Sequence, residues 1–166
     1  MSEATPSRLK SPTLAPGYWN NSAATYRNRW NGYYLTGDLM YRDADGWYYH
    51  VDRVVDAVEL GGGAWLYTAM TEERILAACP DVRDCTVVSA PAADGTVVTD
   101  VLLSLHTGAD EGGDRTPAIR TALGEPAAAT LRQVVVVPDD ALVLGPTGKV
   151  RKFLMRRRHV AEMAVS

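Results

Sequence analysis

The sequence predicts an α+β fold: a small mixed domain of mostly antiparallel strands with flanking helices, preceded by an aromatic-rich β-hairpin subdomain. Strand patterns outnumber helix patterns, and two strand pairs are joined by Asp-Gly turns, whose glycine readily takes positive φ. All four Trp and all eight Tyr lie between Tyr18 and Tyr67, and Ala, Val, Leu and Gly dominate behind them. At 166 residues the chain can form one ordinary domain, or a domain with a subdomain.

Strands are expected at Leu39–Arg42, Trp47–Val51, Val54–Leu60, Cys85–Ala90, Val97–Leu105 and Leu131–Val137. Asp45-Gly46 separates the first two, and Asp94-Gly95 lies between the fourth and the fifth, which predicts two hairpins. The third strand ends in the triplet Gly61-Gly62-Gly63, where the backbone can approach another group closely.

Three helices are expected. The first runs from Thr71, a candidate N-cap, to Cys79, and Pro80 stops it. The second opens at Thr116-Pro117 and closes at Gly124, with Pro in its first turn and Gly past its last.

The third helix follows Gly148 and is basic. Its apolar residues fall at helical spacing at Val150, Phe153, Leu154 and Val160. Six of the 17 positive charges lie within ten positions, at Lys149, Arg151, Lys152, Arg156, Arg157 and Arg158. We favour the solvated face of an amphipathic helix. Contact with nucleic acid, and docking against CoA phosphates, phosphopantetheine or an acidic carrier protein, stay open as alternatives.

Composition excludes several classes. The 17 Lys and Arg against 20 Asp and Glu give −3, which is no signature of a nucleic-acid or membrane partner. Cys79 and Cys85 match neither a disulfide framework nor a zinc pattern, so a reduced, cytoplasmic setting is expected. The chain has no apolar run of membrane-spanning length, and no secretory signal is expected at its amino terminus. The three His are scattered, and no metal site is predicted.

Two motifs carry chemistry. Thr36-Gly37-Asp38 places a carboxylate beside a glycine, and Pro146-Thr147-Gly148-Lys149 places a lysine on a tight turn. These groups can hold sugar hydroxyls and nucleotide charge, but no phosphate-cradling loop accompanies them. The sequence therefore contains half of an active site. The plainer alternatives are a turn-shaping Asp38, a solvated Lys149, and an Arg53 paired with a neighbouring aspartate.

The motifs follow a known order: Gly17-Tyr18-Trp19-Asn20, Tyr34-Leu35-Thr36-Gly37-Asp38-Leu39, Asp45-Gly46-Trp47-Tyr48, Asp52-Arg53, Gly61-Gly62, Glu73, Pro80 and Pro146-Thr147-Gly148-Lys149. In this order the chain resembles the carboxyl-terminal part of the adenylate-forming superfamily, which includes acyl- and aryl-CoA synthetases, peptide-synthetase adenylation domains and luciferases. The resemblance covers about residues 17–158. It implies an aromatic-rich β subdomain over 17–51, which ends the family's large domain, and a lid domain over 52–166. Residues 1–16 are expected to form a flexible arm.

The resemblance also implies roles. Asp38 binds the ribose hydroxyls of ATP or AMP, and Arg53 reaches the nucleotide. Lys149 bridges the substrate carboxylate and the α-phosphate as the catalytic lysine. After a domain rotation, Leu60, Gly61 and Gly62 line the channel for the thiol of CoA or phosphopantetheine. Magnesium is expected to arrive with the nucleotide rather than on this chain.

Some positions depart from the family pattern. The hinge position, usually acidic or Lys, is Val55, although a register slip would place Asp56 there. Glu59 stands where a Lys is frequent, and the loop from Gly63 to Thr71 is unusually apolar. These changes indicate drift in the face that makes the thioester.

The leading hypothesis is the carboxyl-terminal portion of a split AMP-forming acyl- or aryl-acid ligase. It would act in trans with an adenylating amino-terminal subunit and be inactive alone. Exposed aromatic residues predict association with that subunit or self-association, at Tyr18, Trp19, Trp30, Tyr33 and Tyr34. The alternative is a non-catalytic adaptor or regulatory module that binds a synthase, a carrier protein or CoA.

Overall fold

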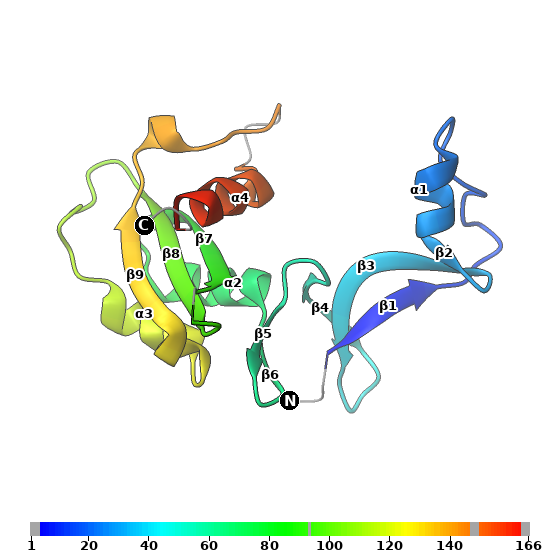
Figure 1. Cartoon of the computed structure of the whole chain (residues 1–166), viewed down its shortest axis with the longest axis horizontal. Helices are drawn as coiled ribbons and strands as arrows, with labels where there is room; N and C mark the ends of the chain where they lie inside the picture. The colour runs from blue at the N-terminus through cyan, green and yellow to red at the C-terminus, as the bar shows by residue number, and fades with distance from the viewer. Residues whose placement is uncertain (1–3, 93, 147–149, 164–166) are drawn as a thin grey trace. The chain divides into compact units, whose positions relative to one another are not determined.

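The structure, a computed structural model, describes residues 4–92, 94–146 and 150–163. It separates into two compact units, Met1–Ala57 and Val58–Ser166. Both combine strands and helices, and most strand pairs are antiparallel, which confirms the predicted α+β class. Figure 1 shows the elements of each unit.

The first unit is built around one long strand. Its elements are β1 (Thr5–Leu9), α1 (Ser22–Arg27), β2 (Arg29–Trp30), β3 (Tyr33–Arg42) and β4 (Tyr48–Arg53). Strand β3 pairs antiparallel with β1, β2 and β4. The predicted hairpin around Asp45-Gly46 is confirmed, and Gly46 has φ 94°.

Thr5–Leu9 forms β1, although these residues fall within the predicted flexible arm. The strand pairs with β3 from Thr5 opposite Met40 to Leu9 opposite Tyr34. The amino-acid composition of β1 did not indicate this pairing, because the hydrogen bonds between β1 and β3 are made by backbone groups. The open edge of a ten-residue strand offers them partners whatever side chains they carry.

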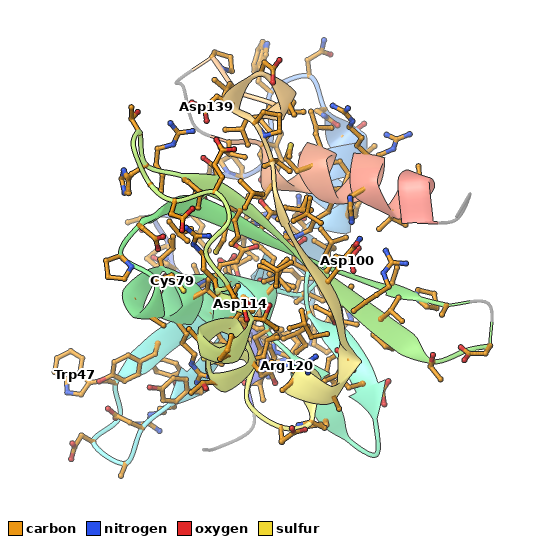
Figure 2. All side chains as sticks on the ribbon, turned by 90° about the vertical axis from the view of Figure 1, so that its left-hand side faces the viewer. Trp47, Cys79, Asp100, Asp114, Arg120 and Asp139 are labelled. Carbon is orange, nitrogen blue, oxygen red and sulfur yellow. The ribbon has the colours of Figure 1, made fainter. Side chains whose placement is uncertain are left out.

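Much of the aromatic surface in this unit lies open to solvent. Among its described residues, seven aromatic side chains are exposed: Tyr18, Trp19, Tyr26, Trp30, Trp47, Tyr48 and Tyr49. Trp19 is 99% exposed, and Figure 2 shows Trp47 projecting from the β3–β4 hairpin. Of the five aromatic residues expected to be exposed, Tyr33 and Tyr34 are partly buried.

The second unit is a layered domain. Its longer elements are β5 (Val58–Gly61), β6 (Ala64–Leu66), α2 (Thr68–Ala78), β7 (Val82–Pro91), β8 (Val97–Leu105), α3 (Thr116–Leu123), β9 (Leu131–Val136) and α4 (Lys152–Met163). Two short 3-10 turns, Ala127–Thr130 and Asp139–Ala141, flank β9. The central sheet has the order β7-β8-β9, antiparallel between β7 and β8 and parallel between β8 and β9.

Helices cover both faces of this sheet (Figure 1). Because side chains alternate along a strand, Val87 and its same-face neighbours pack with α2 and α3, whereas Val88 faces the other way. The first face forms the main core, which includes Ile75 and Ile119. On the second face Val88 packs with Leu102 and Met155, which belongs to α4.

Several predicted boundaries are wrong; the strand expected over Cys85–Ala90, for example, is β7 and runs from Val82 to Pro91. The strand expected over Val54–Leu60 begins only at Val58, because residues 54–57 form a turn whose amides at Asp56 and Ala57 donate to the carbonyl of Arg53. Helix α2 begins at Thr68, one turn before the predicted N-cap Thr71. The amide of Thr71 donates to the carbonyl of Tyr67, and its side chain is buried.

Within the described part of the chain, no helix has both the length and the apolar character needed to cross a membrane.

Candidate functional site

The structure brings the two predicted nucleotide ligands together. Asp38 on β3 and Arg53 on β4 are register partners, and Arg53 Nε lies 2.9 Å from Asp38 Oδ1. The third member is His50, whose Nε2 lies 3.9 Å from the same oxygen. Both charged side chains are accessible, Arg53 at 61% and Asp38 at 29% of their full exposure. A polar ligand can therefore reach the pair from solvent.

Local geometry fixes Asp38. Gly37 has φ 78°, a left-handed conformation that glycine adopts without strain. The Asp38 amide donates to Thr36 Oγ1 at 3.0 Å, and the Gly37 carbonyl accepts from the Val54 amide at 2.9 Å. The Thr-Gly-Asp motif thus ties β3 to the end of β4. The pairing of Asp38 with Arg53 was not predicted from the sequence.

The predicted hinge residue, Val55, lies in the turn that follows β4. Its side chain is 86% exposed. The chain passes from the first unit to the second between Ala57 and Val58, two residues beyond it. Val55 therefore lies close in sequence to the boundary between the two units.

The predicted thiol-channel residues lie at the β5–β6 hairpin. Gly61, Gly62 and Gly63 all have positive φ, at 91°, 62° and 80°. A Cβ on any of them would meet nothing within 4 Å, so backbone conformation rather than space requires glycine here. Leu60 packs against the main core. Leu60 and Gly61 border an open hollow of about 660 Å³, together with the β7–β8 turn and the residues before β9.

Lys149, the predicted catalytic lysine, lies outside the described residues. The segments on either side of it are described and held together. Leu144 and Val150 form an antiparallel bridge, and the amide of Arg151 donates to the carbonyl of Val143 at 2.7 Å. Helix α4 then begins at Lys152.

A buried carboxylate, Glu72, holds the start of α4. Its side chain is only 5% exposed and accepts from Lys152 Nζ at 2.8 Å and from Arg156 Nη2 at 2.8 Å. Lys152 Nζ also lies 3.2 Å from Asp84 Oδ1. Burial is the largest influence on the pKa of Lys152 and would lower it, but the carboxylates of Glu72 and Asp84 outweigh burial and raise it. We call Glu72, Asp84, Lys152 and Arg156 the Glu72 cluster.

A second buried carboxylate, Asp100 on β8, contacts the far part of α4. Its side chain is fully buried and accepts two hydrogen bonds from Arg132, at 3.0 and 2.6 Å, and one from Gln133 at 2.9 Å. His159 Nε2 lies 2.7 Å from Asp100 Oδ2 (Asp100 is labelled in Figure 2). Burial would raise the pKa of Asp100, but these hydrogen bonds together hold it below its usual range.

Neither buried carboxylate was predicted from the sequence, and the solvated face expected for the basic tail is wrong in part. Lys152 and Arg156 were assigned to a solvated face, but their side chains turn inward, whereas Arg151 and Arg157 are exposed. The spacing of Lys152, Arg156 and His159, at i, i+4 and i+7, was a usable signal, because it places three basic residues on one helical stripe. Among the described residues, no cluster of three or more potential metal ligands occurs.

Comparison with known proteins identifies relatives of this chain. No protein-family model matches the chain. The chain is 43% identical over 173 residues to the 3-aminoavenalumate diazotase of a Streptomyces species, an alignment that covers 93% of this chain and 30% of the relative. It is 37% identical over 161 residues to the medium/long-chain fatty-acid–CoA ligase FadD8 of Mycobacterium tuberculosis, covering 90% of this chain and 27% of the relative.

A solved structure agrees. The o-succinylbenzoate coenzyme A synthetase MenE from Bacillus subtilis, in complex with its acyl-adenylate intermediate, matches with a TM-score of 0.75 and 26% identity. The match covers 93% of this chain and 31% of that one. Other structures of the same synthetase hold AMP, or ATP with a magnesium ion. The chain spans about 30% of the length of these relatives. It therefore belongs to the adenylate-forming superfamily of acyl- and aryl-CoA ligases, and it corresponds to the carboxyl-terminal part of those enzymes.

Proposed function

We propose that the chain is the carboxyl-terminal portion of an AMP-forming acyl- or aryl-acid ligase. It supplies Asp38, Arg53 and Lys149 to a nucleotide whose phosphates are held by a large adenylating domain outside these 166 residues. In the split arrangement expected from the sequence, that domain is a separate subunit.

The observation that carries the proposal is the pairing of Asp38 with Arg53 across β3 and β4. A carboxylate is a good acceptor for ribose hydroxyls, and a neighbouring guanidinium holds its oxygens in place. Solved relatives that match along nearly the whole chain hold ATP or AMP, which supports a nucleotide as the ligand.

The reaction would convert a carboxylate and ATP into an acyl-adenylate and pyrophosphate. Negative charge builds up on the α-phosphate oxygens as the carboxylate attacks phosphorus, and the ammonium group of Lys149 would stabilise it. Asp38 and Arg53 would fix the sugar and so keep the α-phosphate in line for attack. ATP enters, AMP leaves only after the acyl group has passed to the acceptor, and magnesium would travel with the nucleotide.

We propose CoA or a carrier-bound phosphopantetheine as the acceptor in the second half-reaction, delivered past the β5–β6 hairpin. The positive-φ turn at Gly61–Gly63 supports this, because a turn without side chains lets a thin substrate arm pass close to the backbone. The relative at 43% identity is named as a diazotase rather than as a CoA ligase, so the acceptor assays should not assume CoA.

The exposed aromatic side chains of the first unit support the binding of a large apolar partner. Burying one aromatic side chain is worth roughly 1.5–3 kcal/mol, and the unit exposes seven. We propose that the adenylating domain, or a second copy of the chain, covers them. A clean monomer by native mass spectrometry, with tryptophans quenched by solvent, would count against this.

A non-catalytic adaptor is the second candidate. Val55 favours it, because an exposed apolar side chain stands where the family pattern has a charged hinge residue. Such an adaptor would bind a synthase, a carrier protein or CoA without taking part in adenylation.

Copurification from the native source, followed by pyrophosphate exchange, separates the candidates. We expect an adenylating domain to copurify and to exchange radiolabelled pyrophosphate into ATP only when the chain is present. The acids to test are 3-aminoavenalumate, o-succinylbenzoate and a medium-chain fatty acid. Exchange by the partner without the chain, at the same rate, would favour the adaptor.

A further inference from the structure

The Glu72 cluster lies at the outer edge of the central sheet. Strand β7 is an edge strand, and Val87 turns its backbone groups outward there. The Val87 amide donates to Glu72 Oε1 at 2.9 Å, and its carbonyl accepts from Arg156 Nε at 3.0 Å. Helices α2 and α4 cover opposite faces of the sheet, so these contacts join them around the edge of β7.

Lys152 is the first residue of α4 and the closest member of the cluster to Lys149, three positions away in sequence. Its ammonium contacts carboxylates from two elements, Glu72 on α2 and Asp84 on β7. On the other side of Lys149, the chain enters beside Leu144, which bridges Val150. Leu144 and Val150, which lie on either side of Lys149 in the sequence, are therefore bridged to each other.

We propose that Glu72, acting through Lys152, is a positioning residue for the adenylation half-reaction. The inference rests on the proposed function, since it takes Lys149 as the catalytic lysine. Glu72 and Lys152 hold the first turn of α4 on the edge of β7, and this fixes the point from which the chain leads back to Lys149. In this role they act through the backbone and need not touch the nucleotide or the acid.

An ordinary surface ion pair would not have this effect, because exposed pairs contribute little and rearrange easily. Glu72 is almost fully buried, and its contacts with Lys152, Arg156 and the Val87 amide satisfy both carboxylate oxygens. Removing one partner of such a group leaves buried charge uncompensated, so the structure around it must shift. A shift of about 1 Å at a catalytic group is enough to cost roughly a hundredfold in rate.

The test uses Lys152→Met, which removes the ammonium but leaves Glu72 its bonds from Arg156 and Val87. In the complex with the adenylating domain, we expect the rate constant for pyrophosphate exchange, measured with each of the three acids named above, to fall about 10- to 100-fold. Transfer from chemically prepared acyl-adenylate to the acceptor should stay unchanged, because it does not need Lys149. Lys152→Arg, which keeps the charge, should restore most of the exchange. A merely structural role would lower both half-reactions together.

The matched control is Arg115→Met. Arg115 is a buried cation in the same unit that donates to Asp81 at 2.9 Å through Nε, away from α4. It should lower stability without changing the ratio of the two half-reactions. Hydrogen–deuterium exchange on the chain alone tests, independently of activity, whether Lys152 holds the start of α4 in place. Lys152→Met should speed exchange in residues 141–156, and Arg115→Met should not.

The outcomes are separable. If wild-type complex shows no pyrophosphate exchange, the proposed function fails, and the hydrogen–deuterium result still decides whether Lys152 holds the start of α4 in place. If wild type exchanges pyrophosphate and Lys149→Ala abolishes it, but Lys152→Met and Glu72→Gln keep full rates, the positioning role is overturned.

Discussion

Arg53 Nε lies 2.9 Å from Oδ1 of Asp38, across neighbouring strands of the first unit. The two residues come from motifs separated by a hairpin, and the β3–β4 register makes them partners. The carboxylate proposed to bind ribose is thus held by the guanidinium proposed to reach the same nucleotide.

Asp38→Asn is expected to weaken nucleotide binding. Hydrogen bonds to a charged acceptor contribute about 1.5–3 kcal/mol, so the Kd for ATP should rise about 10- to 100-fold in the complex with the adenylating domain. Isothermal titration with ATP measures it. Asp45→Asn, the same charge removal in the hairpin turn of the same unit, is the control and should leave the Kd unchanged. Equal affinities in the two variants would remove Asp38 from the nucleotide site.

Acid is expected to destabilise the second unit through Asp100. Its pKa is lowered in the folded state, so the stability it contributes is complete above the unfolded value of about 3.9 and is lost as pH falls through the folded pKa. Urea unfolding between pH 7 and pH 3 should show this decline in the free energy of unfolding, within about the last unit of that range. Asp100→Asn should flatten the decline and lower stability near neutral pH, because Arg132 loses its charged partner. An identical acid decline in that variant would contradict the assignment.

The two cysteines are expected to be inert in the folded chain. Burial raises the pKa of Cys79, and it raises the pKa of Cys85 to about 12. At pH 8 only about one Cys85 thiol in ten thousand would be ionised, and the thiolate is the reactive form. Iodoacetamide labelling followed by mass spectrometry should find neither residue modified in buffer and both modified in urea. Fast labelling of the folded chain would show that these thiols are reachable.

Gly61→Ala is expected to slow the second half-reaction more than the first. Gly61 has φ 91°, and a side chain in a left-handed conformation costs about 1–2 kcal/mol, so the β5–β6 hairpin should shift or loosen. Transfer from prepared acyl-adenylate to CoA measures the effect. Gly108→Ala is the matched control, since Gly108 has φ 84° and open space in a loop elsewhere in the same unit. Equal transfer rates in the two variants would remove the hairpin from the acceptor path.

Local signals predicted much of the fold. The Asp45-Gly46 hairpin was found because the turn needs positive φ, and α3 was found because Pro117 and Gly124 mark its ends. Strand β8 has the bounds that were predicted for the strand after the Asp94-Gly95 turn. These features depend on residues close together in sequence, which is why a single sequence reveals them.

Features that depend on distant partners were missed. Strand β1 pairs through its backbone with residues far along the chain, and its side chains carry no strand pattern. Glu72 and Lys152 are 80 positions apart, so neither residue alone indicates a buried ion pair. The Asp38–Arg53 pair was likewise hidden, because the bulge after Leu39 sets which residues of β3 and β4 face each other.

The most direct measurement of the central claim is pyrophosphate exchange by the chain together with its copurified adenylating domain, comparing Lys149→Ala with Arg157→Ala. Arg157 is an exposed cation of the same tail and serves as the control. The account expects Lys149→Ala to lower the exchange rate about 100- to 1,000-fold, as for loss of one group that stabilises transition-state charge, with unfolding unchanged. Arg157→Ala should exchange at the wild-type rate. Exchange at the wild-type rate in Lys149→Ala would contradict the proposal that this chain supplies the catalytic lysine.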